Sequence, residues 1–431
     1  MNSNAKVKGK GWFWVPTLYF AEGIPYVVVM TVSVIMYKKL EVSNTEIALY
    51  TSWLYLPWVI KPLWSPFVDL IKTKRYWIVA MQLLIGAAFA GVAFTIPTSE
   101  FFRYTLAFFW LLAFSSATHD IAADGFYMLG LPKHDQAFFV GIRSTFYRLA
   151  MITGQGVLII LAGSLEGALG ITTGWMVTFG ILAALMLAFM VYHAFMLPRP
   201  EILQQTTEVS RKNILNEFVQ TITLFFKKEG IIAMLAFLLL FRFGEAQLVK
   251  MASPFLLDEV SEGGLALSTA EVGIVYGTIG IIALTIGGIL GGIVVSRRGL
   301  KYWLWWMVLS INLPNAAYIY LSFVRPESFY LISTAVAIEQ FGYGFGFTAY
   351  MLYMIYIAEG PYKTAHFALC TAFMALGMML PGMFSGALQE MIGYQKFFVW
   401  VVVSAIPGFI AAYFIPLDAN FGKKTETEQQ T

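Results

Sequence analysis

The sequence predicts an all-α membrane protein with twelve transmembrane helices arranged in two six-helix bundles. Three observations predict this fold class. Hydrophobic residues make up 58% of the 431 positions and charged residues only 12%, whereas an ordinary soluble domain has about 25% charged residues. Apolar runs of about 20 residues recur along the whole chain, and one long polar segment lies between the sixth and the seventh. A soluble globular protein is therefore excluded.

The remaining composition excludes several kinds of partner. The formal net charge of +3 is too small to indicate nucleic acid as a partner. A single cysteine, Cys370, excludes an intramolecular disulfide, and no Cys/His spacing resembles a zinc site. We therefore expect neither a metal nor a cofactor, and a lipid bilayer as the surroundings.

Twelve apolar runs are long enough to cross roughly 30 Å of hydrocarbon at about 1.5 Å per residue. The first run follows three lysines, as in a signal peptide, but it contains Glu22 and lacks a small-residue cleavage site. We therefore expect it to be the first span. The expected spans are 12–37, 46–68, 76–96, 102–129, 136–163, 171–196, 231–257, 270–295, 302–323, 328–357, 364–389 and 396–416.

Lysine and arginine in the short loops predict the orientation, because cationic loops stay in the cytoplasm. With the spans above, 18 of these residues lie on the side of the N-terminus and five on the opposite side. Both termini are therefore expected in the cytoplasm.

The long polar segment divides the chain into two halves. We expect an N-terminal bundle over residues 1–196, a linker over 197–230 and a C-terminal bundle with a short tail over 231–431. Apolar residues recur at helical spacing between Arg211 and Lys228, which predicts an amphipathic helix at the cytoplasmic membrane surface. Six-helix halves with weak internal similarity are typical of secondary transporters that alternate around a central site.

Two basic loops repeat in corresponding places of the halves. The first reads Asp69-Leu-Ile-Lys72-Thr-Lys74-Arg75, and the second reads Gly292-Ile-Val-Val-Ser296-Arg297-Arg298-Gly299-Leu-Lys301. The second resembles the major facilitator superfamily signature Gly-x-x-x-Asp-Arg-x-Gly-Arg-Lys, with Ser296 in place of the acid, and the first is a degenerate copy. The resemblance implies a cytoplasmic gating motif that forms ion pairs and caps helix ends in the outward-open state. Its members here are Asp69, Arg75, Gly292, Arg297, Arg298, Gly299 and Lys301.

Three further segments carry a narrower resemblance. They are Tyr19-Phe-Ala-Glu22-Gly23-Ile-Pro25-Tyr26, Lys61-Pro-Leu-Trp64-Ser-Pro66-Phe-Val-Asp69 and Ala117-Thr-His119-Asp120-Ile-Ala-Ala-Asp124-Gly-Phe. They are similar to the peptide and acetyl-CoA transporter family, whose bacterial members include the AmpG-type muropeptide permeases. The longer members of that family have two further spans, so this chain departs from their pattern.

Ionisable residues inside spans mark candidate sites, because a charge that faces lipid costs about 2.5 to 3.5 kcal/mol or more. The expected spans 3, 6, 9 and 12 have none in their central stretches. In the superfamily that the chain resembles, these four spans face lipid, and spans 1, 4, 7 and 10 line the cavity. The candidates for proton coupling are Glu22, Asp120, Asp124, Glu245, Glu339 and His119.

Asp120 and Asp124 are four residues apart, so both carboxylates share one helix face. Two ionised carboxylates there repel each other unless a cation intervenes, and Lys61 is a possible neighbour of Asp124. Our hypothesis is that Glu22 or Asp120 carries the coupling proton. The alternative is that these acids only neutralise buried arginines.

Arg148 is the first candidate for binding a substrate carboxylate, because a guanidinium binds both carboxylate oxygens. Arg242 and Glu245 are spaced to form a pair within one helix, and Lys250 is expected to extend its ammonium to the outer mouth. Gly23 and Pro25 are expected to break the first span. Aromatic rings near the acids offer stacking surfaces for sugars. The substrate-binding candidates are Arg148, Arg143, Lys61, Arg242, Gln340, Tyr26, Trp58 and Tyr343.

The resemblance implies a secondary active transporter and no enzyme. The expected function is proton-coupled import of anhydromuropeptides or related amino-sugar and peptide solutes through the bacterial inner membrane, by a monomer. The alternatives are a permease for another oligosaccharide or a siderophore, and a membrane receptor that does not transport.

Overall fold

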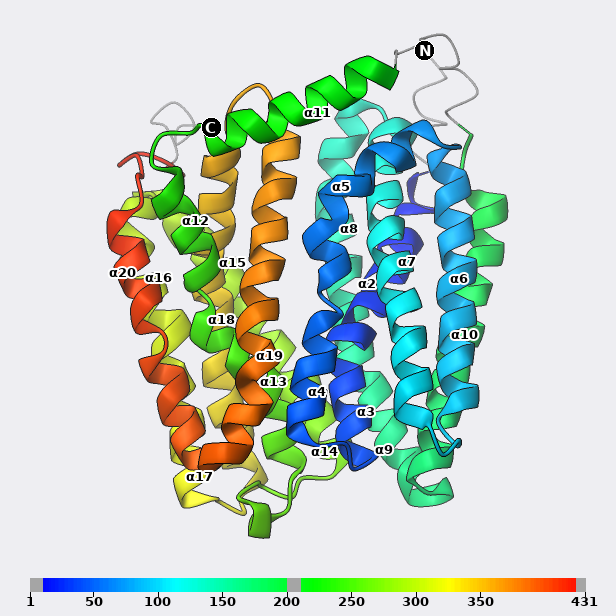
Figure 1. The fold of residues 1–431 in the computed structure, drawn as a ribbon, viewed down its shortest axis with the longest axis vertical. Helices are drawn as coiled ribbons and strands as arrows, with labels where there is room; N and C mark the ends of the chain where they lie inside the picture. Colours follow the sequence, from blue (N-terminus) through cyan, green and yellow to red (C-terminus); the bar gives the residue numbers. More distant parts are fainter. Residues whose placement is uncertain (1–10, 200–210, 424–431) are drawn as a thin grey trace. The chain divides into compact units, whose positions relative to one another are not determined.

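The computed structural model describes residues 11–199 and 211–423, and the regular structure of this part of the chain is helical, without a strand (Figure 1). Side chains at positions 69–70, 133–134, 137 and 211–218 are outside the description. The chain forms two compact units, Met1–Val42 with Ile60–Arg211, and Ser43–Val59 with Lys212–Thr431. The segment 43–59 thus belongs to a different unit from the residues on either side of it.

The first unit consists of long helices, two of which are each formed by three consecutive elements. Its elements are α2 (Val15–Val27), η1 (Val28–Val32), α3 (Ser33–Lys39), most of α5 (Leu56–Leu70), α6 (Lys74–Thr95), α7 (Phe101–Gly130), α8 (Lys133–Ile152), η2 (Thr153–Val157), α9 (Leu158–Leu169) and α10 (Ile171–Met196). The two composite helices are α2–η1–α3 and α8–η2–α9. Within the unit, α2 packs against α7 and α8, and α6 packs against α7 and α10.

The second unit begins with α4 (Asn44–Trp53) and continues after the central segment. Its further elements are α11 (Arg211–Phe226), α12 (Ile231–Leu240), α13 (Phe243–Leu257), η4 (Val260–Glu262), α14 (Thr269–Val272), η5 (Gly273–Gly280), α15 (Ile281–Arg298), α16 (Leu300–Asn312), η6 (Leu313–Asn315), α17 (Ala316–Val324), α18 (Phe329–Ala358), α19 (Lys363–Val403) and α20 (Ile406–Phe414). Helix α4 packs against α13 and α19, and α18 packs against α15 and α16.

Nine segments of the described chain are long and apolar enough to cross a membrane. One of them, Lys363–Phe414, contains two of the expected spans, because α19 continues through a kink at Gly393 (φ 75°, ψ 161°). The expected second span is interrupted between α4 and α5. The number of twelve spans and the cytoplasmic position of the termini stay predictions.

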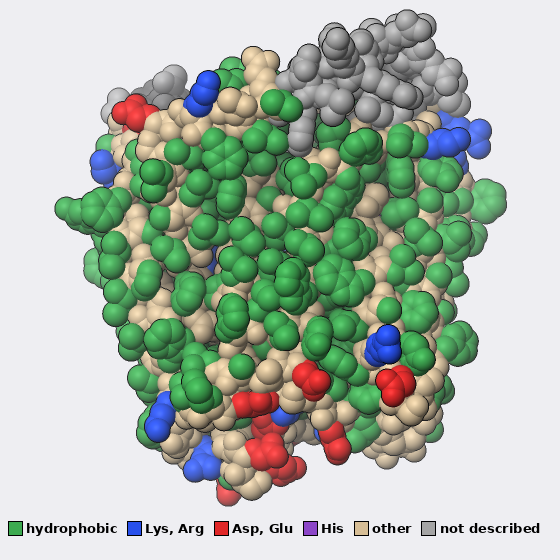
Figure 2. Space-filling view, in the orientation of Figure 1, with side chains coloured by type: hydrophobic (Ala, Val, Ile, Leu, Met, Phe, Trp, Pro, Cys, Tyr) green, Lys and Arg blue, Asp and Glu red, His purple; other side chains and the backbone are tan. Residues whose placement is uncertain are grey.

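Hydrophobic side chains dominate the face drawn in Figure 2, and acidic and basic side chains gather toward the ends of the helices. Phe195 and Ile232 are 82% and 83% exposed, for example. Such exposure of large apolar residues is expected where lipid replaces water as the solvent. Helix α11, where the sequence predicts an amphipathic helix, runs crosswise to α12 (Figure 1).

The first span does not break at Gly23 and Pro25, contrary to the prediction. Helix α2 includes both residues, and the winding changes only afterwards, in the π-helical segment η1. Gly23 has a packing role instead, because a Cβ atom there would lie 2.7 Å from the Cβ of Ala150 in α8. The missing side chain therefore lets α2 and α8 approach closely.

A hydrogen-bonded chain joins four helices of the first unit. The Gln82 amide of α6 lies 3.0 Å from His119 Nε2 in α7 and 2.9 Å from His193 Nδ1 in α10. His193 Nε2 in turn lies 3.0 Å from the hydroxyl of Thr17 in α2. The two histidines and the glutamine are each 0% exposed. His119, expected among the groups that exchange protons, is thus held on the interior side of α7.

Replacing Gln82 by leucine should destabilise the first unit. The change leaves two buried imidazole nitrogens without a partner, and each unpaired polar group costs about 1 to 3 kcal/mol. Thermal unfolding of the purified protein in detergent measures the loss. Gln82→Glu is no control, because it adds a buried charge, so we choose Gln395→Leu in α19, whose amide donates to the Ser322 carbonyl at 3.3 Å in a half-buried position. Equal stability of both variants would contradict the prediction.

Candidate functional site

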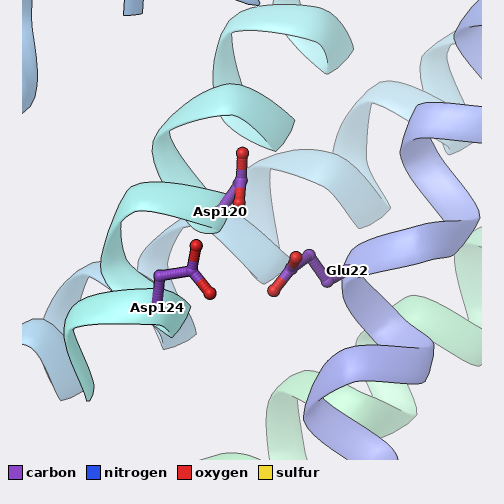
Figure 3. Close-up of side chains that lie close together, drawn as sticks. All are labelled: Glu22, Asp120 and Asp124. Carbon is purple, nitrogen blue, oxygen red and sulfur yellow. The ribbon is translucent and has the colours of Figure 1, made fainter. Parts of the chain in front are cut away.

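Three acidic side chains from two helices meet in the first unit. Glu22 comes from α2, and Asp120 and Asp124 come from α7; one carboxylate oxygen of each lies within 4.8 Å of one from either of the others (Figure 3). Glu22 is the most buried, at 8% exposure, and the side chains of Asp120 and Asp124 are 22% and 42% exposed. The spacing of four residues predicts the shared face of the two aspartates, and the packing of α2 against α7 adds Glu22.

Two cations pair with two of the three acids. Lys61 of α5 forms an ion pair with Asp120. Arg143 of α8 forms an ion pair with Asp124, with 2.9 Å between Nη2 and Oδ1. Glu22 Oε2 has no hydrogen-bond partner among the described residues. When all three acids and both cations are ionised, the cluster therefore has a net charge of one negative unit.

Aromatic rings hold the arginine in place. The Arg143 guanidinium lies 4.5 Å from the ring centre of Tyr19 and 5.2 Å from that of Tyr127, within the range of cation–π attraction. The Tyr19 hydroxyl donates to Asp124 Oδ1 at 3.3 Å. Tyr19 was missed as a candidate, although it lies three residues before Glu22 and so on the same side of the helix.

The direct partner of Lys61 differs from the predicted one. The sequence suggests Asp124 as its neighbour, but the ion pair is with Asp120, and Asp124 interacts with Lys61 only at longer range. Which carboxylate each cation reaches depends on how α5 and α8 are turned about their own axes. The sequence does not contain that information.

Of the two arginines in α8, only Arg143 joins the acids. Arg148 is exposed and lies five residues further along the helix, on a different side. Among the aromatic candidates, Tyr26 and Trp58 are half-buried, and both take part in side-chain interactions. Binding of a substrate by Arg148, Tyr26 or Trp58 stays a prediction.

A second polar cluster lies in the other unit, around the break between α12 and α13. Arg242 occupies that break, donates a hydrogen bond to the Tyr343 hydroxyl and lies 4.8 Å from the ring centre of Phe347. The predicted pair within one helix does not form as a hydrogen bond, because both Glu245 oxygens are without a hydrogen-bond partner. Glu339 accepts a hydrogen bond from the amide of its neighbour Gln340 at 3.0 Å.

Lys250 is buried, contrary to the expectation that it extends to the outer mouth. Its side chain is 1% exposed, its ammonium donates to the Thr51 hydroxyl at 2.9 Å, and it lies 5.2 Å from the ring centre of Tyr55. Both partners come from the segment 43–59. Because that segment is distant in sequence from Lys250, this contact was not predictable from the sequence.

The gating residues are partly described. Arg75 donates through Nη2 to the Ala194 carbonyl and, at 3.2 Å, through Nε to the Leu197 carbonyl, so it caps the end of α10. The side chain of Asp69 lies outside the described residues. In the second copy, Arg297, Lys301 and Gly292 are exposed, and the Arg298 guanidinium donates to the Tyr302 hydroxyl at 2.5 Å. Gly299 has a φ of 82°, which favours glycine, at the junction of α15 and α16.

Comparison with known protein families identifies the family of this chain. Its residues 17–365 match the profile of the Major Facilitator Superfamily. The chain belongs to the major facilitator superfamily. This confirms the family that the basic loops of the sequence resemble.

Curated relatives within the superfamily point to AmpG-type permeases. The chain is 27% identical over 358 residues to the anhydromuropeptide permease of Escherichia coli strain K12, covering 82% of this chain and 69% of that protein. It is 24% identical over 417 residues to a Rickettsia conorii transporter named AmpG 4, covering 94% of this chain and 96% of the relative. The predicted resemblance to AmpG-type permeases is thus confirmed.

Solved structures of the superfamily share the fold. The nucleoside transporter NupG superposes with a TM-score of 0.70 at 16% identity, over 97% of this chain and all of that chain. A D-xylose-proton symporter superposes with a TM-score of 0.72 at 14% identity, over 96% of this chain and 99% of the symporter chain. These likenesses show the fold. The family match and the permease relatives show that this major facilitator protein is a multi-pass membrane transporter and not an enzyme.

Proposed function

We propose that this superfamily member is a proton-coupled importer of anhydromuropeptides or related amino-sugar and peptide solutes, working by alternating access in the bacterial inner membrane. The Glu22–Asp120–Asp124 cluster is the observation that supports proton coupling most directly. A relative named anhydromuropeptide permease supports the substrate class, although it is the longer protein.

The cluster has the chemistry of a proton site because it has one acid more than it has cations. An uncompensated charge in a poorly hydrated position is costly, and a proton removes that charge without needing space. Three carboxylates also resemble a metal site, but two of them already pair with Lys61 and Arg143. A divalent ion would have to compete with both cations, so we favour the proton.

Glu22 is our preferred carrier of the coupling proton, ahead of Asp120. Asp120 and Asp124 each have a cationic partner, whereas Glu22 Oε2 has no hydrogen-bond partner. When the cluster becomes accessible to each side of the membrane in turn, Glu22 exchanges its proton with that side.

Uptake of labelled anhydromuropeptide into energised membrane vesicles tests the proposal. We expect accumulation of at least about tenfold over the external concentration, and its collapse when a protonophore is added. Equilibration without accumulation would refute proton coupling. Accumulation of a labelled oligosaccharide or siderophore in place of the muropeptide would refute the substrate class and leave the coupling intact.

A further inference from the structure

The unit formed by Ser43–Val59 and Lys212–Thr431 contains a second pair of buried acids. Glu245 of α13 is 0% exposed and Glu339 of α18 is 1% exposed. The two carboxylates interact with each other electrostatically. Neither is part of the Glu22 cluster, and the transport cycle proposed above does not use them.

Arg242 is the cation that interacts with this pair of acids. Arg242 interacts electrostatically with Glu245, but its guanidinium donates to the Tyr343 hydroxyl and lies over two aromatic rings. Lys250 is directed to Thr51 and Tyr55 instead. Fully ionised, the pair and Arg242 would therefore retain one negative charge in a site with no exposed surface.

The helices around the pair are irregular where they meet it. The break between α12 and α13 contains Arg242, the π-helical η5 contains Tyr276, and the 3-10 segment η6 ends at Asn315. In membrane proteins such irregular backbone is tolerated where it lines a cavity or a binding site. Three irregular helices at one polar cluster thus indicate a functional site and not only packing.

A buried polar atom without a partner lies in the same place. The Tyr318 hydroxyl has no hydrogen-bond partner among the described residues, and Tyr318 and Asn315 are 0% and 1% exposed. Asn315 interacts with Glu245, and Tyr318 interacts with both acids. Leaving such a group unpaired costs about 1 to 3 kcal/mol, so a state of the protein in which it gains a partner is expected.

The ionisable groups that act on the pair come from each irregular helix. They are Arg242 beside α13, Tyr276 of η5 and Tyr318 of α17. No cation of α15, α16 or α19 acts on either acid within the described part of the chain. The balance of charge at the pair is therefore determined by the two acids and Arg242.

We propose that the Glu245–Glu339 pair is a second proton-binding site, so that two protons cross the membrane with each solute molecule. The inference rests on the proposed proton-coupled transport. A proton is the ligand that fits, because the site needs one positive charge and a proton, unlike a metal ion, needs no cavity. Each unit then takes up one proton, at Glu22 in the first and at Glu245 or Glu339 in the second.

The proton-to-solute ratio of the full chain in proteoliposomes tests this inference. The membrane potential is clamped to zero with valinomycin and equal potassium, and labelled anhydromuropeptide is the probe. A tenfold proton gradient then holds about a 100-fold solute gradient if two protons are coupled, and about a tenfold gradient if one is. We expect about 100-fold for the natural chain and about tenfold for both Glu339→Gln and Glu245→Gln.

The matched variant Glu339→Asp keeps the acid and should keep the 100-fold gradient. A tenfold gradient in the natural chain overturns the second site while leaving the proposed function standing, even if the glutamine variants fail to fold. A 100-fold gradient that persists in both glutamine variants also overturns it. If the solute gradient held by the natural chain does not depend on the proton gradient, the proposed function itself is refuted. The two failures are therefore distinguishable.

Discussion

Glu22→Gln should abolish the proton coupling of the acid cluster in the first unit while leaving exchange of solute across the membrane intact. The amide removes the one acid of the cluster that has no cationic partner, and the Lys61–Asp120 and Arg143–Asp124 ion pairs remain. The cluster then has no net charge and no need for a proton. Under a tenfold proton gradient, we expect the accumulation ratio to fall about tenfold, because one coupled proton is lost.

Counterflow in proteoliposomes provides the second readout of this variant. Labelled solute outside exchanges for unlabelled solute inside without net proton movement, so counterflow should proceed at a rate close to that of the natural chain. Glu100→Gln, an exposed acid before α7, serves as the matched control and should accumulate normally. Normal accumulation by both Glu22→Gln and Asp120→Asn would disprove our assignment of the coupling proton.

Gly344→Ala should be one of the most destabilising glycine-to-alanine changes in the second unit. A Cβ atom at Gly344 of α18 would lie 1.9 Å from the Leu284 carbonyl oxygen of α15, which is backbone and cannot move aside alone. The two helices must separate, and such overpacking costs about 1 to 3 kcal/mol. Unfolding in detergent with increasing denaturant measures the cost.

Two glycines of the facing helix are matched controls for this change. A Cβ atom at Gly288 would make an ordinary contact of 3.6 Å, and one at Gly292 would meet nothing within 4 Å. Alanine at either position should be neutral or stabilising by about 0.4 to 1 kcal/mol, because it reduces the freedom of the unfolded chain. If all three variants are equally stable, close packing of α15 and α18 does not explain the glycines.

The acid cluster was largely predictable from the sequence because its signals are local. The spacing of Asp120 and Asp124 is one helical turn, and an acid such as Glu22 in an apolar run is conspicuous. The pairings were not predictable. Whether Lys61 or Arg143 reaches a given carboxylate depends on the rotation of packed helices by a few tens of degrees, which apolar spacing does not specify.

The irregular parts of the fold were the least predictable. Gly23 and Pro25 are the residues that usually mark a break, yet α2 continues through them, and the winding changes in η1, where the sequence is a run of apolar residues. Asn315 likewise stands out only once its neighbours are known. In both cases tertiary packing decides the local geometry, so a single sequence gives little warning.

Residues 43–59 belong to the same unit as the C-terminal part of the chain, although they precede the central segment. If the chain were cut in the central segment, the N-terminal fragment would keep α4, whose Asn44 donates to Gln389 at 2.7 Å and lies against Gly386. The C-terminal fragment would thus lack one of its own helices and expose the surface of α13 and α19 that α4 covers. The C-terminal half is then not a self-sufficient folding unit, because it depends on α4 being made in the same membrane.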